Sequence, residues 1–240
     1  MKSSVSFSSE QLRADFYPTT DTRIFARTTL RYERNAIMPD YSIENEIING
    51  GCKTVCGVDE AGRGPLCGPV CAAAVILPLG CEIEGLNDSK KLTEKKREAL
   101  FDVIIDKAIC YTIQFADNEE IDCVNILNAT MECMTRAVNG LSVRPDYVII
   151  DGNKCPEQLD IPSRSVVKGD AISMSIAAAS ILAKVSRDRL MYEYDKQYPE
   201  YGFAMHKGYG TKAHYDAIFA NGISPIHRKS FLKNLNEHKL

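Results

Sequence analysis

The sequence predicts an α/β fold, in which helices cover a sheet, and two observations support this. First, short apolar runs that suit buried strands alternate with longer segments of helical periodicity between residues 54 and 167. Second, the stretch after Asp170 is apolar or small on almost all sides in its first half and charged in its second half. The first half of such a helix is expected to pack on a sheet and the second half to reach solvent.

The fold is expected to open with two strands, "TVCGV" (54–58) and "VCAAAVIL" (70–77), each a short apolar run. Thr93 has the chemistry of a helix N-cap, and apolar residues follow it at helical spacing. The remaining elements are expected as a strand at 109–116, a helix at 121–140 closed by Asn139-Gly140, strands at 146–151 and 164–167, and the long helix that begins at Asp170.

The composition is that of an ordinary globular protein with a sizeable core. The chain has 240 residues, of which 45% are hydrophobic and 25% charged. A net charge of −3 gives no global attraction to nucleic acid, but residues 201–240 carry six lysines and arginines against two acidic residues. A local basic face of this kind can hold phosphates.

Nine cysteines are scattered without a C-x-x-C pair, which favours free thiols in the cytoplasm over a zinc site. No apolar run approaches the roughly 20 residues of a membrane span. Residues 1–37 are rich in Ser, Thr and Arg and lack apolar periodicity, so we expect a flexible extension over 1–40 and one domain over 41–236. Translation that starts at Met38 is an alternative.

Acidic residues stand where three expected elements end or begin. Asp59 and Glu60 directly follow the first strand, Asp151 ends "YVIID", and Asp170 begins the long helix. Each has an ordinary alternative: a solvated pair, an Asp-Gly turn and an N-cap, respectively. If 54–58 and 146–151 are neighbouring strands, however, these carboxylates meet at the edge where α/β sheets place ligands.

Four converging carboxylates repel one another unless divalent cations neutralise them. Hard oxygen ligands suit Mg²⁺ or Mn²⁺, and two such ions about 4 Å apart catalyse phosphodiester hydrolysis. We expect electrostatics rather than burial to set the pKa values of these carboxylates.

Three further stretches could contact a ligand. In "AGRGPLCGP", Gly62 and Gly64 approximate a dinucleotide fingerprint, but a strand rather than a helix follows; glycines there let the backbone approach a phosphate or hydroxyl. "NDSKKLTEKKR" (87–97) is either a phosphate anchor or a solvated lysine face. In "HKGYGTKAH" (206–214), Tyr209 either stacks on a sugar or base or is an ordinary loop tyrosine.

Several long motifs occur together in one order: "GVDEAGRGPLCGPV", "DSKKLTEKKR", "VIIDG", "KGDAISMSIAAASILAKVSRDR", "HKGYGTKAH" and "PIHRKSF". Over roughly residues 41–236 the chain thereby resembles bacterial ribonuclease HII, the type 2 ribonuclease H family; we see no resemblance in residues 1–37. The resemblance implies a ribonuclease H-like fold, a five-stranded mixed sheet flanked by helices with a helical C-terminal portion.

The resemblance also implies the activity, which is endonucleolytic cleavage of RNA in RNA–DNA hybrids and on the 5′ side of ribonucleotides embedded in DNA. The products would carry a 3′-hydroxyl and a 5′-phosphate. By motif position, the metal-binding and catalytic residues would be Asp59, Glu60, Asp151 and Asp170. The substrate-binding residues would be Gly62, Arg63, Gly64, Ser89, Lys90, Lys168 and Tyr209. The Gly62-Arg63-Gly64 loop would read the ribose 2′-hydroxyl, and Tyr209 would pack on the sugar at the RNA–DNA junction.

The expected cofactor is therefore a pair of Mg²⁺ or Mn²⁺ ions. The expected partners are RNA–DNA hybrids and DNA that contains ribonucleotides, bound by a monomer with no membrane contact. Two alternatives remain open: a hybrid-binding module without catalysis, and a metal-dependent phosphohydrolase of small substrates.

Overall fold

The computed structural model describes residues 38–235 of the chain. The extension expected at 1–37 lies outside the described residues, as does the question of a start at Met38. Asp40 already belongs to the folded part, because its amide donates to the Ile172 carbonyl (2.9 Å) and its carbonyl accepts from the Met174 amide (3.0 Å). Asp40, which we had placed in the extension, therefore contacts the folded domain.

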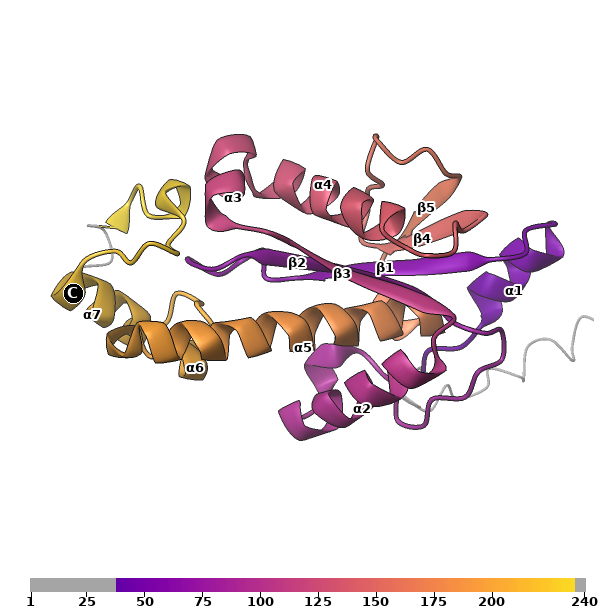
Figure 1. Ribbon diagram of the computed structural model, residues 1–240, viewed down its shortest axis with the longest axis horizontal. Coiled ribbons are helices and arrows are strands. Elements are labelled where there is room, and N and C mark those ends of the chain that lie inside the picture. Colours follow the sequence, from indigo (N-terminus) through magenta and orange to yellow (C-terminus); the bar gives the residue numbers. More distant parts are fainter. Residues whose placement is uncertain (1–37, 236–240) are drawn as a thin grey trace, which may run out of the picture. The chain divides into compact units, whose positions relative to one another are not determined.

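Five strands form one mixed sheet in the order β3-β2-β1-β4-β5, as expected (Figure 1). Strand β1 pairs antiparallel with β2 and parallel with β4, while β2–β3 is antiparallel and β4–β5 parallel. The strands are β1 (Val55–Ala61), β2 (Val70–Ile76), β3 (Cys110–Ala116), β4 (Tyr147–Asp151) and β5 (Ser163–Val166). The centre of the sheet is therefore β1, which carries two of the four predicted metal ligands.

Helices cover both faces of this sheet: α4 lies on one face, and α5 together with α2 on the other (Figure 1). No helix within residues 38–235 is both long and apolar enough to cross a membrane. The helices are α1 (Ser42–Asn49), α2 (Glu94–Lys107), α3 (Asn118–Val124), α4 (Ile126–Asn139), α5 (Met174–Gln197), α6 (Phe203–His206) and α7 (Lys212–Asn221). Short 3-10 turns occur at η1 (Ser89–Lys91), η2 (Gly169–Ala171), η3 (Pro199–Tyr201) and η4 (Lys229–Phe231).

Three local expectations were wrong in detail. Strand β1 runs on through Asp59 and Glu60 instead of ending before them. The helix expected at 121–140 is divided at Asn125, which has a positive φ (68°) with an extended ψ (162°) and caps α4 with its own side chain. Asp170 lies in η2 and not in α5. The N-cap of α5 is Ser173, whose hydroxyl oxygen accepts a hydrogen bond from the Ile176 amide (3.1 Å).

A glycine in β1 brings the start of α5 close to the central strand. A Cβ on Gly57 would lie 2.2 Å from the carbonyl carbon of Ser175, so only glycine permits this approach. The turn η2 immediately precedes α5, and it is held near the C-terminal ends of β1 and β4 by the same packing. This contact places Asp170 within reach of the strand carboxylates.

The C-terminal portion is helical, as expected, and it packs on the loop that follows β1. Leu66 and Cys67 of that loop share one hydrophobic cluster with residues of α5, α6, α7 and the turns around them. The other buried members of this cluster are Met191, Tyr201, Phe203, Ile218 and Ile226. The loop is therefore packed between the sheet and the C-terminal portion.

Candidate active site

Three carboxylates meet at the C-terminal ends of β1 and β4. The parallel register pairs Val58 with Ile150, so the next residues along, Asp59 and Asp151, stand side by side. Asp170 joins them from η2, and the three residues each offer a carboxylate oxygen within 4.8 Å of the others. This is the convergence that the strand ends predicted.

Backbone donors hold the two strand carboxylates in place. The amide of Glu60 donates to Oδ1 of Asp59 (2.7 Å), and the amide of Gly169 donates to Oδ1 of Asp151 (2.6 Å). Such bonds fix the orientation of each carboxylate, so the remaining oxygen lone pairs are directed by the fold.

Lys90, in η1, reaches the third carboxylate. Its Nζ donates to Oδ2 of Asp170 at 3.2 Å, although most of the lysine side chain is exposed. Burial lowers the pKa of Lys90, but the charge of Asp170, the hydrogen bond to it and the charges of Asp59 and Asp88 together outweigh burial, so the net shift is upward. Lys90 therefore acts as a cation for the cluster, and of the predicted substrate contacts it is the one that touches a carboxylate of the cluster.

Burial is the main cause of the raised pKa values in this cluster, so our expectation that electrostatics would dominate was wrong. The side chain of Asp59 lies under α5, and burial, followed by the charges of Glu60 and Asp151, raises its pKa well above the usual value. Burial and then the charge of Asp170 raise the pKa of Asp151. The cluster thus holds negative charge that the protein's own donors compensate only in part.

Glu60 lies between the three aspartates and the following loop. It is outside the group whose oxygens approach within 4.8 Å, and its Oε1 is instead 3.5 Å from Nη1 of Arg63. Burial raises the pKa of Glu60, the charge of Arg63 opposes this, and the charge of Asp151 adds to it. Glu60 is therefore electrostatically linked to both the cluster and the loop.

Ser89 faces inward, which does not suit a direct substrate contact. It is 4% exposed, and its hydroxyl lies 3.0 Å from the hydroxyl of Ser180 on α5. The Ser180 hydroxyl in turn hydrogen-bonds Asp59 and lowers its pKa. Sequence reasoning missed Ser180, because a contact between a helix and a strand 121 positions earlier leaves no spacing signal.

The two glycines of the loop after β1 serve different purposes. Gly64 is exposed, and a Cβ there would meet Cε1 of Tyr209 at 3.5 Å, so the loop and the tyrosine ring adjoin. Gly62 is buried with φ 98°, and a Cβ there would lie 2.1 Å from Nε of Arg187. The space left by Gly62 is thus filled from inside the protein, and only Gly64 leaves room for a ligand.

The other predicted substrate contacts are accessible. Tyr209 is 45% exposed, and the side chain of Arg63 is 49% exposed. Lys168 is exposed in a left-handed conformation (φ 59°) at the N-terminal end of η2, two residues before Asp170. All three can therefore be reached by a macromolecular substrate.

A second group of potential metal ligands, formed by Cys67, His214 and His227, is buried in the C-terminal portion. The amide of Ser224 donates to Nδ1 of His227 (2.8 Å), so the proton of that ring is on Nε2. Nε2 of His227 then donates to Nε2 of His214 (3.1 Å), whose Nδ1 donates to the Tyr209 carbonyl (3.0 Å). This chain of hydrogen bonds already uses the nitrogens that a metal ion would need, and it supports the Tyr209 loop.

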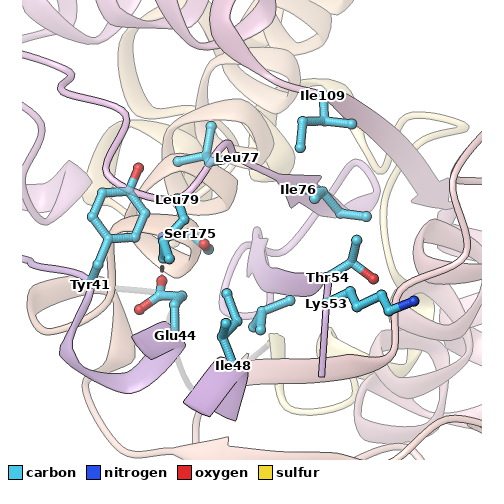
Figure 2. Close-up of a pocket in the computed structure, with 11 residues that line it drawn as sticks. Tyr41, Glu44, Ile48, Lys53, Thr54, Ile76, Leu77, Leu79, Ile109 and Ser175 are labelled. Carbon is cyan, nitrogen blue, oxygen red and sulfur yellow. Dashed lines mark hydrogen bonds between the residues drawn. The ribbon is translucent and has the colours of Figure 1, made fainter. Parts of the chain in front are cut away.

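The pocket in Figure 2 lies beside α1 and shares no residue with the carboxylate cluster. It has a volume of about 60 Å³, and one of the residues that line it is the buried Glu44. Oε1 of Glu44 accepts from the Ser173 hydroxyl (2.7 Å) and the Ser175 amide (3.0 Å), whereas Oε2 has no partner within residues 38–235. Glu44 therefore caps the start of α5, where the helix dipole favours a negative charge.

Comparison with known proteins gives a consistent result. Residues 56–234 match the family model described as Ribonuclease HII. A ribonuclease HII of Acetivibrio thermocellus is 54% identical over 227 residues, which span 93% of this chain and 88% of that protein. About 17 of 240 residues remain outside that alignment, fewer than the 37 before Met38, so the similarity reaches into the segment where we expected none.

Solved structures show the same fold. The ribonuclease H2 of Pyrococcus horikoshii superposes with a TM-score of 0.64 at 29% identity, covering 78% of this chain and 97% of that one. A Bst-RNase HIII structure in complex with Mn²⁺ superposes with a TM-score of 0.61 at 18% identity, covering 77% of this chain and 68% of that one. The ribonuclease H-like fold implied by the sequence is confirmed.

Proposed function

The chain belongs to the ribonuclease HII family of endonucleases, and from that premise we propose that it cuts on the 5′ side of ribonucleotides embedded in duplex DNA and hydrolyses the RNA strand of RNA–DNA hybrids. The products would carry a 3′-hydroxyl and a 5′-phosphate. The observation that supports this most directly is the meeting of Asp59, Asp151 and Asp170 beside an exposed loop and tyrosine.

The carboxylate cluster fits a divalent cation, Mg²⁺ or Mn²⁺. Its oxygen donors are hard ligands, and burial leaves their negative charge only partly compensated. Asp59, Asp151 and Asp170 would hold the ions, with Glu60 completing the set from its position beside Asp151. Two bound ions would supply an activated water and stabilise the 3′-oxygen leaving group. The Mn²⁺ complex of the structurally similar Bst-RNase HIII supports this assignment.

The chain's own residues orient the cluster and the substrate. The Glu60 amide and the Ser180 hydroxyl hold Asp59, and Lys90 holds Asp170 until a cation or a phosphate competes for it. Arg63, Gly64 and Tyr209 adjoin one another on the surface, so one nucleotide can contact all three. A 2′-hydroxyl both donates and accepts hydrogen bonds, and exposed backbone groups at Gly64 can satisfy it without obstruction by a Cβ.

We propose that the protein acts as a monomer on DNA in the cytoplasm. All nine cysteines are free, which suits a reducing compartment. Lys207 and Lys212, which lie within three residues of Tyr209 in the sequence, add positive charge that suits a phosphate backbone.

Cleavage of an end-labelled duplex that contains one ribonucleotide tests the proposal. We expect a single cut 5′ of the ribonucleotide in Mg²⁺ or Mn²⁺, no cut in EDTA, and no cut of the all-DNA duplex. Binding without cleavage would favour the hybrid-binding module. Hydrolysis of small phosphodiesters without duplex cleavage would favour the small-substrate phosphohydrolase.

A further inference from the structure

Two buried arginines lie behind the loop that follows β1. Arg187 on α5 is 1% exposed and Arg228, just before η4, is 0% exposed. Arginine is almost never fully buried unless it is paired. Neither forms an ion pair within residues 38–235, and the nearby carboxylate of Asp188 is bound to Lys184 and Arg97 instead. Their partners are backbone carbonyls.

Arg228 binds four carbonyls of this loop. Its Nε donates to Gly68 (2.9 Å), its Nη1 to Arg63 (3.0 Å) and Pro65 (2.8 Å), and its Nη2 to Gly62 (2.7 Å). Hydrogen bonds from a charged donor are about twice as strong as neutral ones. One guanidinium therefore fixes the path of the chain from residue 62 to residue 68.

Arg187 joins the loop to the segment that carries the tyrosine. It donates to the carbonyls of Pro69 (2.9 Å), Cys67 (3.2 Å) and Lys207 (3.0 Å). Lys207 is two residues before Tyr209. The position of the tyrosine relative to the loop is thus set by the same side chain.

The direction of these carbonyls determines the direction of the amides. A trans peptide unit is planar, so its N–H points opposite to its C=O. The carbonyls of Gly62 and Arg63 point inward to Arg228, and the amides of Arg63 and Gly64 therefore point outward. Both residues are exposed, and within residues 38–235 neither amide has an acceptor.

The arginines also place positive charge beneath these amides. Burial and the charge of Arg187 lower the pKa of Arg228 to about 9, which leaves it protonated at neutral pH. A fixed positive potential behind two outward N–H groups favours an oxygen acceptor in front of them.

We propose that Arg187 and Arg228 are positioning residues for ribose recognition: they hold the amides of Arg63 and Gly64 toward the ribose 2′-hydroxyl, and the preference for a ribonucleotide depends on them. The inference rests on the proposed function and deepens it. It assigns part of the selectivity to two side chains that do not touch the substrate.

Binding without metal measures this preference apart from catalysis. Fluorescence anisotropy in EDTA compares a duplex with one ribonucleotide against the same duplex in DNA. We expect wild type to bind the ribonucleotide duplex more tightly than the all-DNA duplex. In Arg228→Lys, which keeps the charge but cannot reach four carbonyls, we expect the ratio of the two affinities to fall at least about fivefold. Affinity for all-DNA, and for Mn²⁺ by calorimetry, should change less than about twofold. Arg187→Lys should act in the same direction.

Arg189→Lys is the matched control. Arg189 is on the same helix, but it pairs with Glu98 on the surface and lies over the ring of Phe101. Its substitution should leave the preference unchanged. The inference is overturned if the Arg228→Lys protein keeps the full preference, or if its affinity falls equally for both duplexes.

Two further outcomes separate the inference from its premise. If wild type cuts the ribonucleotide duplex yet binds both duplexes equally, selectivity arises at the carboxylates and the inference is wrong. If wild type neither prefers nor cuts that duplex, the proposed function fails.

If the arginine variants do not fold, amide hydrogen exchange on wild type tests whether the loop is held in place before the duplex binds. The amides of Leu66 and Gly68 donate to Gly208 and Ile226, so both should be protected already in the free protein. Protection that appears only when the duplex binds would show that the loop is not held in advance.

Discussion

At the scale of single residues, Asp59 has conflicting requirements. Its carboxylate is buried and lies beside three other acidic groups, Glu60, Asp151 and Asp170, which costs stability unless a cation is bound. Retaining such a group suggests that its charge is needed for function, and the cost can be measured.

The substitution Asp59→Asn should abolish cleavage and raise the melting temperature of the metal-free protein by at least about 2 °C. The folded-state pKa of Asp59 is raised, so metal-free wild type gains stability as pH falls through that pKa, and the variant lacks this gain. The difference in melting temperature should therefore shrink at acid pH. Asp160→Asn, at an exposed carboxylate, should change neither property. Near-normal cleavage by Asp59→Asn would contradict the metal assignment.

The pair His214 and His227 should make the protein sensitive to mild acid. Burial is the main cause that lowers both pKa values to about 4, so below the unfolded-state value of about 6.5 the unfolded chain takes up protons first. Stability should fall between about pH 6.5 and pH 4, by about 1–2 kcal/mol per histidine at pH 5.

Urea unfolding at pH 7.5 and pH 5.0 measures this. The acidic cluster shifts stability in the opposite direction, so the informative quantity is the difference from the double variant His214→Gln/His227→Gln. We expect a shallower pH dependence in the variant. Equal slopes would show that the two rings do not titrate as described.

At the scale of elements, the position of the site depends on the contacts at the N-terminal end of α5. This end of the helix packs against Gly57 of β1, follows the turn that carries Asp170, and is capped by Ser173 and by Glu44 of α1. Two stretches of chain that are distant in sequence, residues 44–57 and residues 170–175, therefore meet at the N-terminal end of one helix.

Glu44→Ala should lower the free energy of unfolding by about 1–3 kcal/mol, because a buried hydroxyl and a helix amide lose their acceptor. Glu46→Ala is the matched control on the same helix; its carboxylate is exposed and pairs with Arg164, so its loss should cost less than about 1 kcal/mol. Chemical denaturation of both variants gives the comparison. Equal effects would mean that Glu44 contributes no more than a surface ion pair.

The sequence predicts well what depends on periodicity and on strand ends. Asp59 and Asp151 could be placed together from two short apolar runs, because parallel neighbours end at the same edge. It predicts poorly what depends on long-range packing. Nothing local shows that Arg187 and Arg228 are buried or that Ser89 turns inward, since arginine and serine are usually exposed. The outward amides near Tyr209 follow from those unforeseen contacts.

At the scale of the whole molecule, the open question is how much of the chain the activity needs. Residues 38–235 contain the sheet, both helical layers, the carboxylates and the two arginines. The family match begins only at residue 56, whereas the alignment with the Acetivibrio thermocellus protein reaches upstream of Met38. The two starting points differ in how much of the N-terminal segment a shortened chain would need for activity.

We expect a chain that starts at Met38 to keep its cleavage rate within about twofold and its melting temperature within about 2 °C, because among residues 38–235 the contacts that hold the start of α5 begin at Asp40. A chain that starts at Lys53 should have a much lower cleavage rate and a lower melting temperature. It lacks Glu44, the cap of α5, and Ile47, which packs in a hydrophobic cluster with Val55 and Ile176. Cleavage of the single-ribonucleotide duplex and thermal melting should be measured on both proteins. A large loss already at Met38 would show that the upstream segment, which the Acetivibrio thermocellus protein shares in part, belongs to the working enzyme. The boundary near residue 40 would then have to move upstream.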